Sequence, residues 1–169
     1  MYLNPEEYNP YYKTYIEKMS FDSALWLALK TQGETIYKFY KSVPVDKHNY
    51  RYAENKWTVK EILLHIIDAE RVFAYRALRI ARQDKTALAG FDQDDYVINS
   101  NAENRSMTSL LEEYRSVRMA SVALFESFSD EALLSIGTAS GSSVSVRAIG
   151  CIILGHEKHH QQIIEERYL

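Results

Sequence analysis

Residues that break regular secondary structure are scarce in this chain. Among its 169 residues are only three prolines and six glycines, and the last proline is Pro44. Average usage of the two residues together is roughly 12%. Proline interrupts a helix because it lacks the amide hydrogen and clashes with the preceding turn. Long unbroken helices are therefore allowed after Pro44, whereas a turn-rich β-sandwich or barrel is not favoured.

Size and composition indicate one globular domain over residues 1–169, with its core between about 21 and 168. The chain is 46% hydrophobic and 25% charged, and a chain of this length buries about 70% of its unfolded surface. The single cysteine, Cys151, has no internal disulfide partner, which suggests a reducing, cytoplasmic setting. A formal charge of −3 without a basic stripe argues against nucleic-acid binding. The sequence has no signal-peptide pattern and no apolar run of membrane-spanning length, so we expect no membrane partner.

Four segments have the apolar spacing of amphipathic helices. They span residues 21–43, 58–81, 107–128 and 146–167. Thr58 to Glu61 and Ser109 to Glu112 each match a capping box, in which two side chains bond free amides of the first helical turn. Helices with such stripes bury them best against one another, so the sequence predicts an all-α four-helix bundle. Periodicity alone does not give the order in which the helices pack.

Three segments lack this spacing. Residues 1–20 are rich in tyrosine and predict an arm laid over a surface rather than a regular element. Residues 84–107 form a long acidic connection between helices two and three, and connections of this length in compact domains are usually functional. Residues 135–145 are rich in Ser, Gly and Thr and predict a flexible connection.

The histidines of the fourth helix suggest a metal site. His156 and His160 are four residues apart in the middle of an isoleucine face, which stacks the two side chains about 6 Å apart. His65, on the second helix, is the natural third donor. Three imidazoles with open positions for water or substrate are typical of catalytic rather than structural metal sites. The alternative is that each is a hydrogen-bonded core or interface histidine.

Three further residues are weaker candidates for a catalytic role: Glu157, His159 and Arg118. The string from His156 to His160 matches the His-Glu-x-x-His pattern of zinc metalloproteases, in which the glutamate is the general base. We do not favour a protease, since no clear strand and no downstream third ligand are expected. Glu157 is therefore expected mainly as an exposed surface residue. His159 points about 60° away from the line of the two ligands and is a possible donor, a substrate contact or simply a surface residue. Arg118 is an anion-binding residue, a snorkelling arginine or an ion-pair partner of a nearby glutamate.

Two stretches resemble the DinB-like (YfiT-like) superfamily. They are Lys56–His65, which contains Trp-Thr-x-x-Glu-x-x-x-His, and Gly155–Ile163, which contains His-x-x-His-His-x-x-Gln-Ile. This superfamily is named after a DNA-damage-inducible bacterial gene. The resemblance implies a four-helix bundle that is often dimeric. It also implies a divalent metal bound by one histidine of helix two and two of helix four, here His65, His156 and His160. Polymerase activity is not implied.

The resemblance suggests a reaction as well as a metal. Some relatives are similar to S-transferases that use a low-molecular-weight thiol such as bacillithiol or mycothiol, and a bound cation lowers the pKa of a thiol. Our leading hypothesis is a metal-dependent thiol S-transferase acting on a small molecule. The alternatives are a metal-dependent hydrolase and a non-catalytic, stress-induced binding or dimerisation module. Zinc or nickel is expected, three imidazoles also accept iron, manganese or copper, and the tyrosine-rich arm is a candidate homodimer contact.

Overall fold

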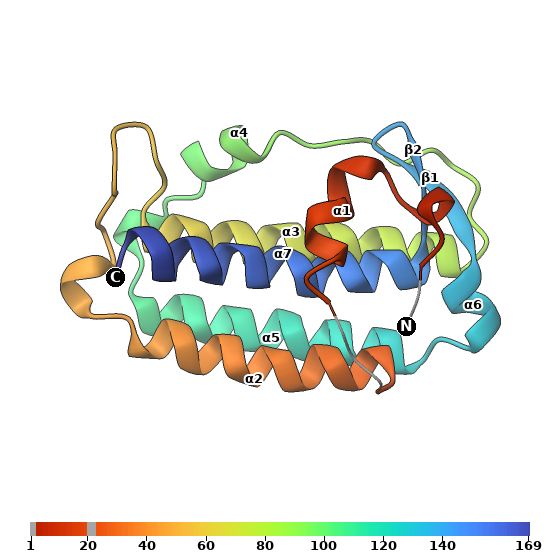
Figure 1. The fold of residues 1–169 in the computed structure, drawn as a ribbon, viewed down its shortest axis with the longest axis horizontal. Coiled ribbons are helices and arrows are strands. Elements are labelled where there is room, and N and C mark those ends of the chain that lie inside the picture. Colours follow the sequence, from red (N-terminus) through yellow and green to blue (C-terminus); the bar gives the residue numbers. More distant parts are fainter. Residues whose placement is uncertain (1–2, 20–22) are drawn as a thin grey trace.

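The computed structural model describes residues 3–19 and 23–169, and within them four long helices form a bundle (Figure 1). The helices are α2 (Leu25–Ser42), α3 (Val59–Ala81), α5 (Met107–Glu126) and α7 (Val146–Arg167). The predicted all-α four-helix bundle is thus confirmed. The predicted start of the first helix at residues 21 and 22 lies outside the described residues.

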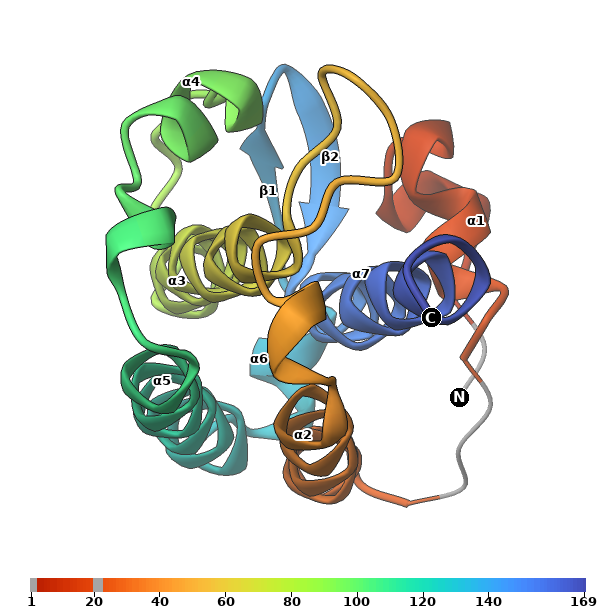
Figure 2. The same cartoon turned by 90° about the vertical axis from the view of Figure 1, so that its left-hand side faces the viewer.

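The order of the four helices is not that of a simple up-and-down bundle. Viewed end-on, α2 neighbours α5 and α7, and α3 neighbours α5 and α7, so consecutive helices are not always adjacent (Figure 2). The colour gradient in Figure 1 shows that α3 and α5 point in the same direction while α2 and α7 point in the opposite one. Two parallel neighbours need a connection that returns along the whole helix. This requirement explains the long segment between α3 and α5, which contains the short helices α4 (Gln93–Ile98) and η4 (Ala102–Asn104).

The helix starts follow local capping chemistry, with one correction. Thr58 accepts a hydrogen bond from the Glu61 amide and the Glu61 carboxylate accepts one from the Thr58 amide, which confirms the first predicted capping box. The second predicted box is wrong. Ser106, three residues earlier than predicted, caps α5 by accepting from the Ser109 amide at 3.1 Å. The Ser109 hydroxyl instead accepts from Arg105.

The segment predicted as a flexible connection before the last helix is a β-hairpin. It follows the short helix α6 (Asp130–Leu134) and pairs β1 (Ile136–Ala139) with β2 (Ser142–Ser145) in antiparallel register. Ser140 and Gly141 both have positive φ, at 51° and 77°, the conformation of a two-residue turn that matches strand twist. The two strands of the hairpin are short. An isolated β-bridge between Ala139 and Leu88 joins the hairpin to the long connection between α3 and α5.

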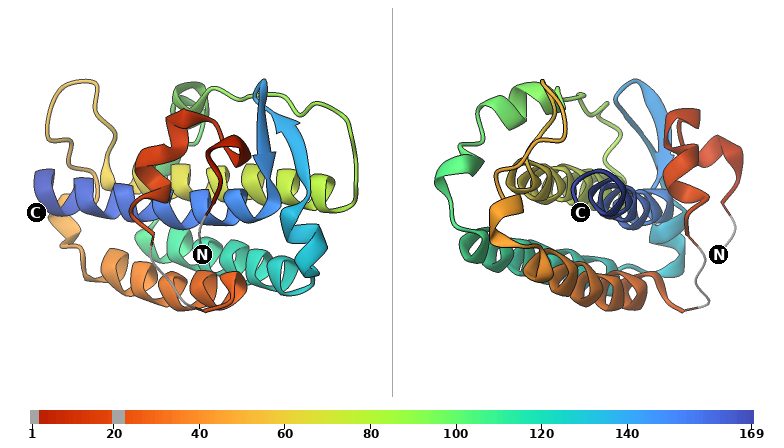
Figure 3. Two further views of the ribbon diagram at one scale, coloured as in Figure 1. Left: turned by 45° about the vertical axis from the view of Figure 1, so that its right-hand side comes forward. Right: turned by 60° about the vertical axis from the view of Figure 1, so that its left-hand side comes forward.

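The N-terminal arm is more regular than the sequence predicts. It contains two 3-10 turns, η1 (Pro5–Glu7) and η2 (Pro10–Tyr12), and the short helix α1 (Lys13–Ile16). The arm lies against α7 and the hairpin (Figure 3). Gly155 on α7 makes this close approach possible, because a Cβ at that position would lie 2.1 Å from the Tyr15 carbonyl oxygen.

A polar layer divides the core at the middle of the bundle. The buried apolar side chains of the described residues form two clusters, one towards the hairpin end and one towards the chain's C-terminus. Between them each long helix contributes a polar residue: Gln32, Glu70, Arg118 and Glu157. No helix in the described part of the chain is long and apolar enough to span a membrane.

Candidate metal centre

Two histidines of the candidate site lie one turn apart on α7. Ser145 caps this helix by accepting from the Ala148 amide at 3.1 Å, and the helix continues without interruption through His156 and His160. Their rings are 4.6 Å apart between centroids, at nearly a right angle. The i, i+4 spacing therefore brings both side chains to one side of the helix, as the sequence predicts.

The third histidine reaches them from α3. The Nε2 atom of His65 is 3.0 Å from Nε2 of His156, and Nε2 of His160 is 3.1 Å from the same atom. All three donor atoms lie within 4.8 Å of one another. The structure thus brings together the three histidines that the sequence predicts, from two helices that are 91 positions apart at His65 and His156.

The donor set fits a divalent cation. Metal–nitrogen bonds of about 2.0–2.1 Å place two ligand nitrogens roughly 2.9–3.4 Å apart for ligand angles between 90° and 110°, and both measured separations fall in this range. Hydrogen bonding explains the arrangement less well, because Nε2 of a neutral imidazole offers either one proton or one lone pair. Nε2 of His156 therefore satisfies one neighbour at most, whereas a cation satisfies all three.

Burial keeps these imidazoles in the neutral form that binds metals. It lowers the pKa of His65 from 6.5 to about 4. Burial, followed by the nearby imidazoles, holds the pKa values of His156 and His160 well below 6.5. At neutral pH all three ring nitrogens are therefore free of the extra proton that would compete with a metal.

Aromatic rings enclose the histidine cluster. Trp57 lies 4.7 Å from the His65 ring, and Tyr15 of the arm lies edge-on to His156 at 5.5 Å between centroids. Phe73, two turns after His65 on α3, lies 6.3 Å from His156. Such rings fix the orientation of the imidazoles and reduce access of water. No sequence pattern points to Tyr15 or Phe73 as neighbours of this cluster, whereas Trp57 is part of the motif that resembles the family.

Two cavities border different histidines of the cluster. The first, which we call the arm cavity, has a volume of about 230 Å³ and is bordered by His65 and His156 together with the tyrosines of the arm. The second, the loop cavity, has a volume of about 270 Å³ and is bordered by His160, Trp57 and Tyr168. The side chains of the three-histidine cluster therefore border two separate cavities.

His159 does not join the three-histidine cluster. Its ring lies 5.3 Å from that of Tyr15, and it borders the loop cavity. Burial and then the charge of Lys18 lower its pKa. Its position agrees with the sequence prediction that it points away from the ligand line, and it leaves His159 available to contact a molecule in the loop cavity.

Glu157 is buried, so the expectation of an exposed surface residue is wrong. The side chain is completely inaccessible to solvent, and its carboxylate accepts four hydrogen bonds. Oε1 accepts from Gln32 and Arg118, and Oε2 accepts from Arg118 and Tyr114. A carboxylate offers about four lone-pair sites, so Glu157 has no free site with which to activate a water molecule.

Arg118 is an ion-pair partner inside the core. Its guanidinium donates to both carboxylate oxygens of Glu70 and to both of Glu157, at 2.6–2.9 Å. Burial opposes its charge, but the carboxylates of Glu157 and Glu70 outweigh burial and hold the pKa of Arg118 well above its usual value. Of the three sequence interpretations of Arg118, the ion pair is the one that the structure shows. Glu70 could have been found from the sequence, because it is a charged residue within the apolar stripe of its helix.

Fold and site together define a class: bundles of four helices in up-down-down-up order with a cluster of three imidazoles between the second and fourth long helices. The chain belongs to the DinB superfamily, whose family model matches residues 28–164. No curated protein matches this sequence significantly.

Solved structures of low sequence identity share the fold. YfiT from Bacillus subtilis, described as a probable metal-dependent hydrolase with an unusual four-helix bundle topology, aligns with a TM-score of 0.75 at 13% identity over 98% of this chain and 90% of its own. The DinB-like protein YjoA from Bacillus subtilis aligns with a TM-score of 0.60 at 18% identity over 85% of this chain and 88% of its own. A mycothiol-dependent maleylpyruvate isomerase aligns with a TM-score of 0.69 at 10% identity, over 87% of this chain but 61% of its own.

Proposed function

We propose that this protein is a metal-dependent enzyme that transfers a thiol to a small electrophilic molecule, with His65, His156 and His160 as ligands of a divalent ion. The observation on which the proposal rests is the convergence of three Nε2 atoms, from the buried His65 and His156 and the partly buried His160, beside two cavities. A structural metal site has all its positions filled by protein, whereas a catalytic one keeps positions open. The cavities therefore favour catalysis over a purely structural or binding role. Zinc or nickel suits three imidazoles, and iron, manganese and copper are the other candidates.

The chain's own residues have defined tasks in such a reaction. The three histidines present neutral nitrogens, and the rings of Trp57 and Tyr15 hold those histidines in place and limit water. A divalent ion bound there would lower the pKa of a thiol and make its sulfur nucleophilic at neutral pH. In the transfer, the thiol proton passes to solvent and the sulfur forms a bond to an electrophilic carbon. That carbon then releases its leaving group with the electron pair.

Two observations favour thiol transfer over hydrolysis. Cavities on two sides of the histidine cluster provide room for a thiol and for an acceptor, whereas hydrolysis requires room for one organic substrate. In addition, all four lone-pair sites of Glu157 are occupied, so it does not act as the general base of a metalloprotease. Hydrolysis is the second candidate, because the structural relative YfiT is described as a probable metal-dependent hydrolase.

We also propose that the chain is a single domain that works in the cytoplasm as a homodimer. Core clusters that each draw on three or more of the long helices support one domain. The arm offers the exposed ring of Tyr11 as a dimer contact, while Tyr12 packs against the bundle. Sedimentation velocity tests the dimer, and a monomer at micromolar concentration would contradict it.

Metal analysis tests the centre itself. We expect protein purified without a nickel column to contain close to one metal ion per chain, and His65→Ala, His156→Ala and His160→Ala each to contain far less. The matched control is His48→Ala, because His48 lies outside the cluster with its ring nitrogen 3.1 Å from the Val43 carbonyl oxygen. If the wild type is metal-free, or if the three variants bind as much metal as His48→Ala, the proposed centre does not exist.

A panel of thiols separates the two reaction classes. The metal-loaded protein is mixed with an electrophilic test substrate such as 1-chloro-2,4-dinitrobenzene, with and without cysteine, glutathione or bacillithiol. We expect product formation that requires a thiol and is lost in His156→Ala. Turnover of ester or amide substrates in the absence of any thiol would instead favour the hydrolase.

A further inference from the structure

Arg76 is a buried cation without a carboxylate partner. Its side chain comes from α3, and the residue is 3% exposed. Among the described residues no carboxylate lies within ion-pair distance, and its Nη2 atom donates to two neutral acceptors, the Ala89 carbonyl at 2.8 Å and the Ser140 hydroxyl at 2.9 Å. Arg118 is equally buried, but it has two glutamates. Since buried charges are normally paired, Arg76 has an uncompensated positive charge.

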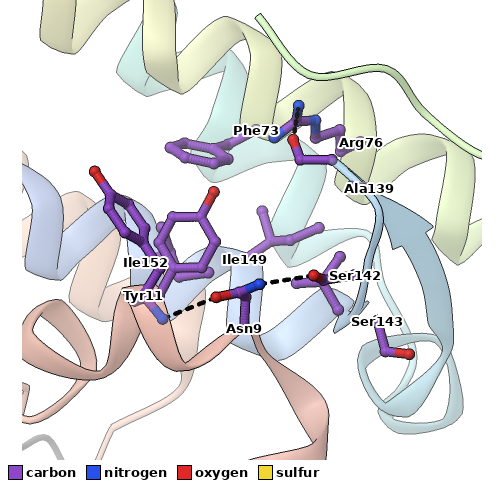
Figure 4. Close-up of a pocket in the computed structure, with 12 residues that line it drawn as sticks. Asn9, Tyr11, Phe73, Arg76, Ala139, Ser142, Ser143, Ile149 and Ile152 are labelled. Carbon is purple, nitrogen blue, oxygen red and sulfur yellow. Dashed lines mark hydrogen bonds between the residues drawn. The ribbon is translucent and has the colours of Figure 1, made fainter.

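The remaining donors of Arg76 face a cavity. The two hydrogen bonds of Arg76 both use Nη2, and the neutral Tyr12 hydroxyl also lies close enough to interact with the guanidinium. Neither Nε nor Nη1 is among the enclosed, unpaired polar atoms of the described residues. The side chain borders both the arm cavity and a neighbouring cavity of about 170 Å³, which we call the hairpin cavity (Figure 4). No other side chain with a full charge borders either one within the described part of the chain. The local charge is therefore positive and open to a ligand.

The walls of the hairpin cavity suit an apolar body. Phe73 and Arg76 line it from α3, Ile149 and Ile152 from α7, and Tyr11 from the arm (Figure 4). The Arg76 guanidinium also lies 5.8 Å from the centroids of both Phe73 and Phe91. Ligand sites commonly combine such apolar walls with a few polar groups that fix orientation. This pairing of walls and charge selects a molecule with an apolar part and an anionic group.

The arm and hairpin cavities are neighbours that share Phe73, Arg76 and Ser140, and the arm cavity continues to His65 and His156. We propose that the two form one site for a small, largely apolar organic carboxylate whose charged group pairs with Arg76 while its reactive part faces the histidine cluster. One arginine without a second cation matches a single negative charge better than a phosphate dianion. The inference rests on the proposed function in one respect, because it takes the reaction to occur at the histidines.

Binding to metal-free protein tests the site separately from the metal centre. Protein treated with EDTA is titrated at pH 8 with benzoate and with its neutral isostere benzamide, with binding followed by calorimetry. At this pH the imidazoles of His65, His156 and His160 are neutral, and no metal is present to bind a carboxylate. We expect benzoate to bind roughly 10- to 100-fold more tightly than benzamide, the usual advantage of a charge-assisted hydrogen bond.

Variants assign that preference to Arg76. We expect Arg76→Gln to abolish the preference for benzoate while leaving benzamide affinity unchanged, and Arg76→Lys to retain part of it. The matched control is Arg82→Gln, which removes the same charge from an exposed position at the end of α3. Circular dichroism checks that each variant folds. If Arg76→Gln does not fold, the comparison of benzoate with benzamide on the wild-type protein still tests the site.

The two proposals fail in different ways. No measurable benzoate binding at millimolar concentration, equal affinities for the two probes, or an unchanged preference in Arg76→Gln would overturn the carboxylate site, whatever the metal content. A protein that prefers benzoate through Arg76 but contains no metal would retain the site and overturn the proposed enzyme.

Discussion

The buried charges of Glu70, Arg118 and Glu157 set the register of the bundle. The three groups satisfy one another by hydrogen bonds at 2.6–2.9 Å, with Gln32 and Tyr114 as further partners of Glu157. A helix shifted by one turn would leave these groups unpaired in an apolar core, which is costly. Glu157 directly follows His156 in the sequence, so the register of the polar layer is also the register of the histidine cluster.

Removing the cation of this layer should destabilise the whole protein. Arg118→Met leaves two buried carboxylates without a counterion, a change that typically lowers the free energy of unfolding by about 3–5 kcal/mol. For a chain of this length the melting temperature should fall by roughly 6–20 °C. Urea and thermal unfolding followed by circular dichroism measure both quantities.

Arg115→Met is the matched control for that prediction, since Arg115 lies one turn earlier on α5 with an exposed side chain above the Tyr37 ring. We expect it to change the free energy of unfolding by less than about 1 kcal/mol. Equal stability of the two variants would show that the polar layer has no net role in stability.

At the scale of elements, periodicity predicts the long helices well because each has to bury one apolar face. Sequence patterns predict all four long helices and the capping of α3 at Thr58. They also predict the three clustered histidines, because the spacing of His156 and His160 follows from helix geometry. Periodicity misses the hairpin, since strands of four residues are too short to show a clear alternation. It also places Glu157 on the surface, because a helical wheel cannot show that Gln32 of α2 and Tyr114 of α5 reach that side of α7.

The contact between the arm and α7 depends on a missing side chain. In Gly155→Ala the new Cβ would lie 2.1 Å from the Tyr15 carbonyl oxygen, so the arm must move away from α7 and from His156. Alanine itself favours the helix, and we therefore expect the bundle to remain folded. Trypsin should cleave the variant after Lys13 and Lys18 several-fold faster than the wild type, as mass spectrometry would show.

Gly90→Ala serves as the control for this change, because its added Cβ would meet the Ser140 hydroxyl at an ordinary 3.5 Å. Cleavage of Gly155→Ala at the rate of this control would mean that the arm does not need its close contact with α7.

At the scale of the molecule, the site is assembled from parts that only the complete fold brings together. The up-down-down-up order places α3 beside α7, and the connection that this order requires supplies Phe91 and Gln93 to the arm cavity. The arm supplies three tyrosines to the same cavity. Helix order was not accessible from periodicity, because an apolar stripe shows which face is buried but not which helix covers it.

Glu7 anchors the arm to the start of α7, where Arg147 lies 140 positions later in the chain. Its carboxylate accepts from Nε of Arg147 at 2.7 Å and from the Ser145 hydroxyl at 2.7 Å. Burial raises the pKa of Glu7, but the hydrogen bonds from Arg147, the Asn4 amide and Ser145 outweigh burial and lower the pKa from 4.5 to about 2. Because the folded-state pKa is the lower one, the carboxylate stabilises the fold above pH 4.5, and this contribution is lost as the pH falls towards 2.

The comparison of wild type with Glu7→Gln isolates this contribution. We expect the wild type to melt several degrees higher than the variant from pH 7 down to about pH 5, and the difference to shrink to nearly zero by about pH 2. Glu6→Gln, at the exposed neighbouring position, should follow the wild type throughout. A difference between wild type and Glu7→Gln that stays constant from pH 7 to pH 2 would show that ionised Glu7 does not hold the arm. In that case the apolar contacts of the arm tyrosines alone would hold them beside the arm cavity.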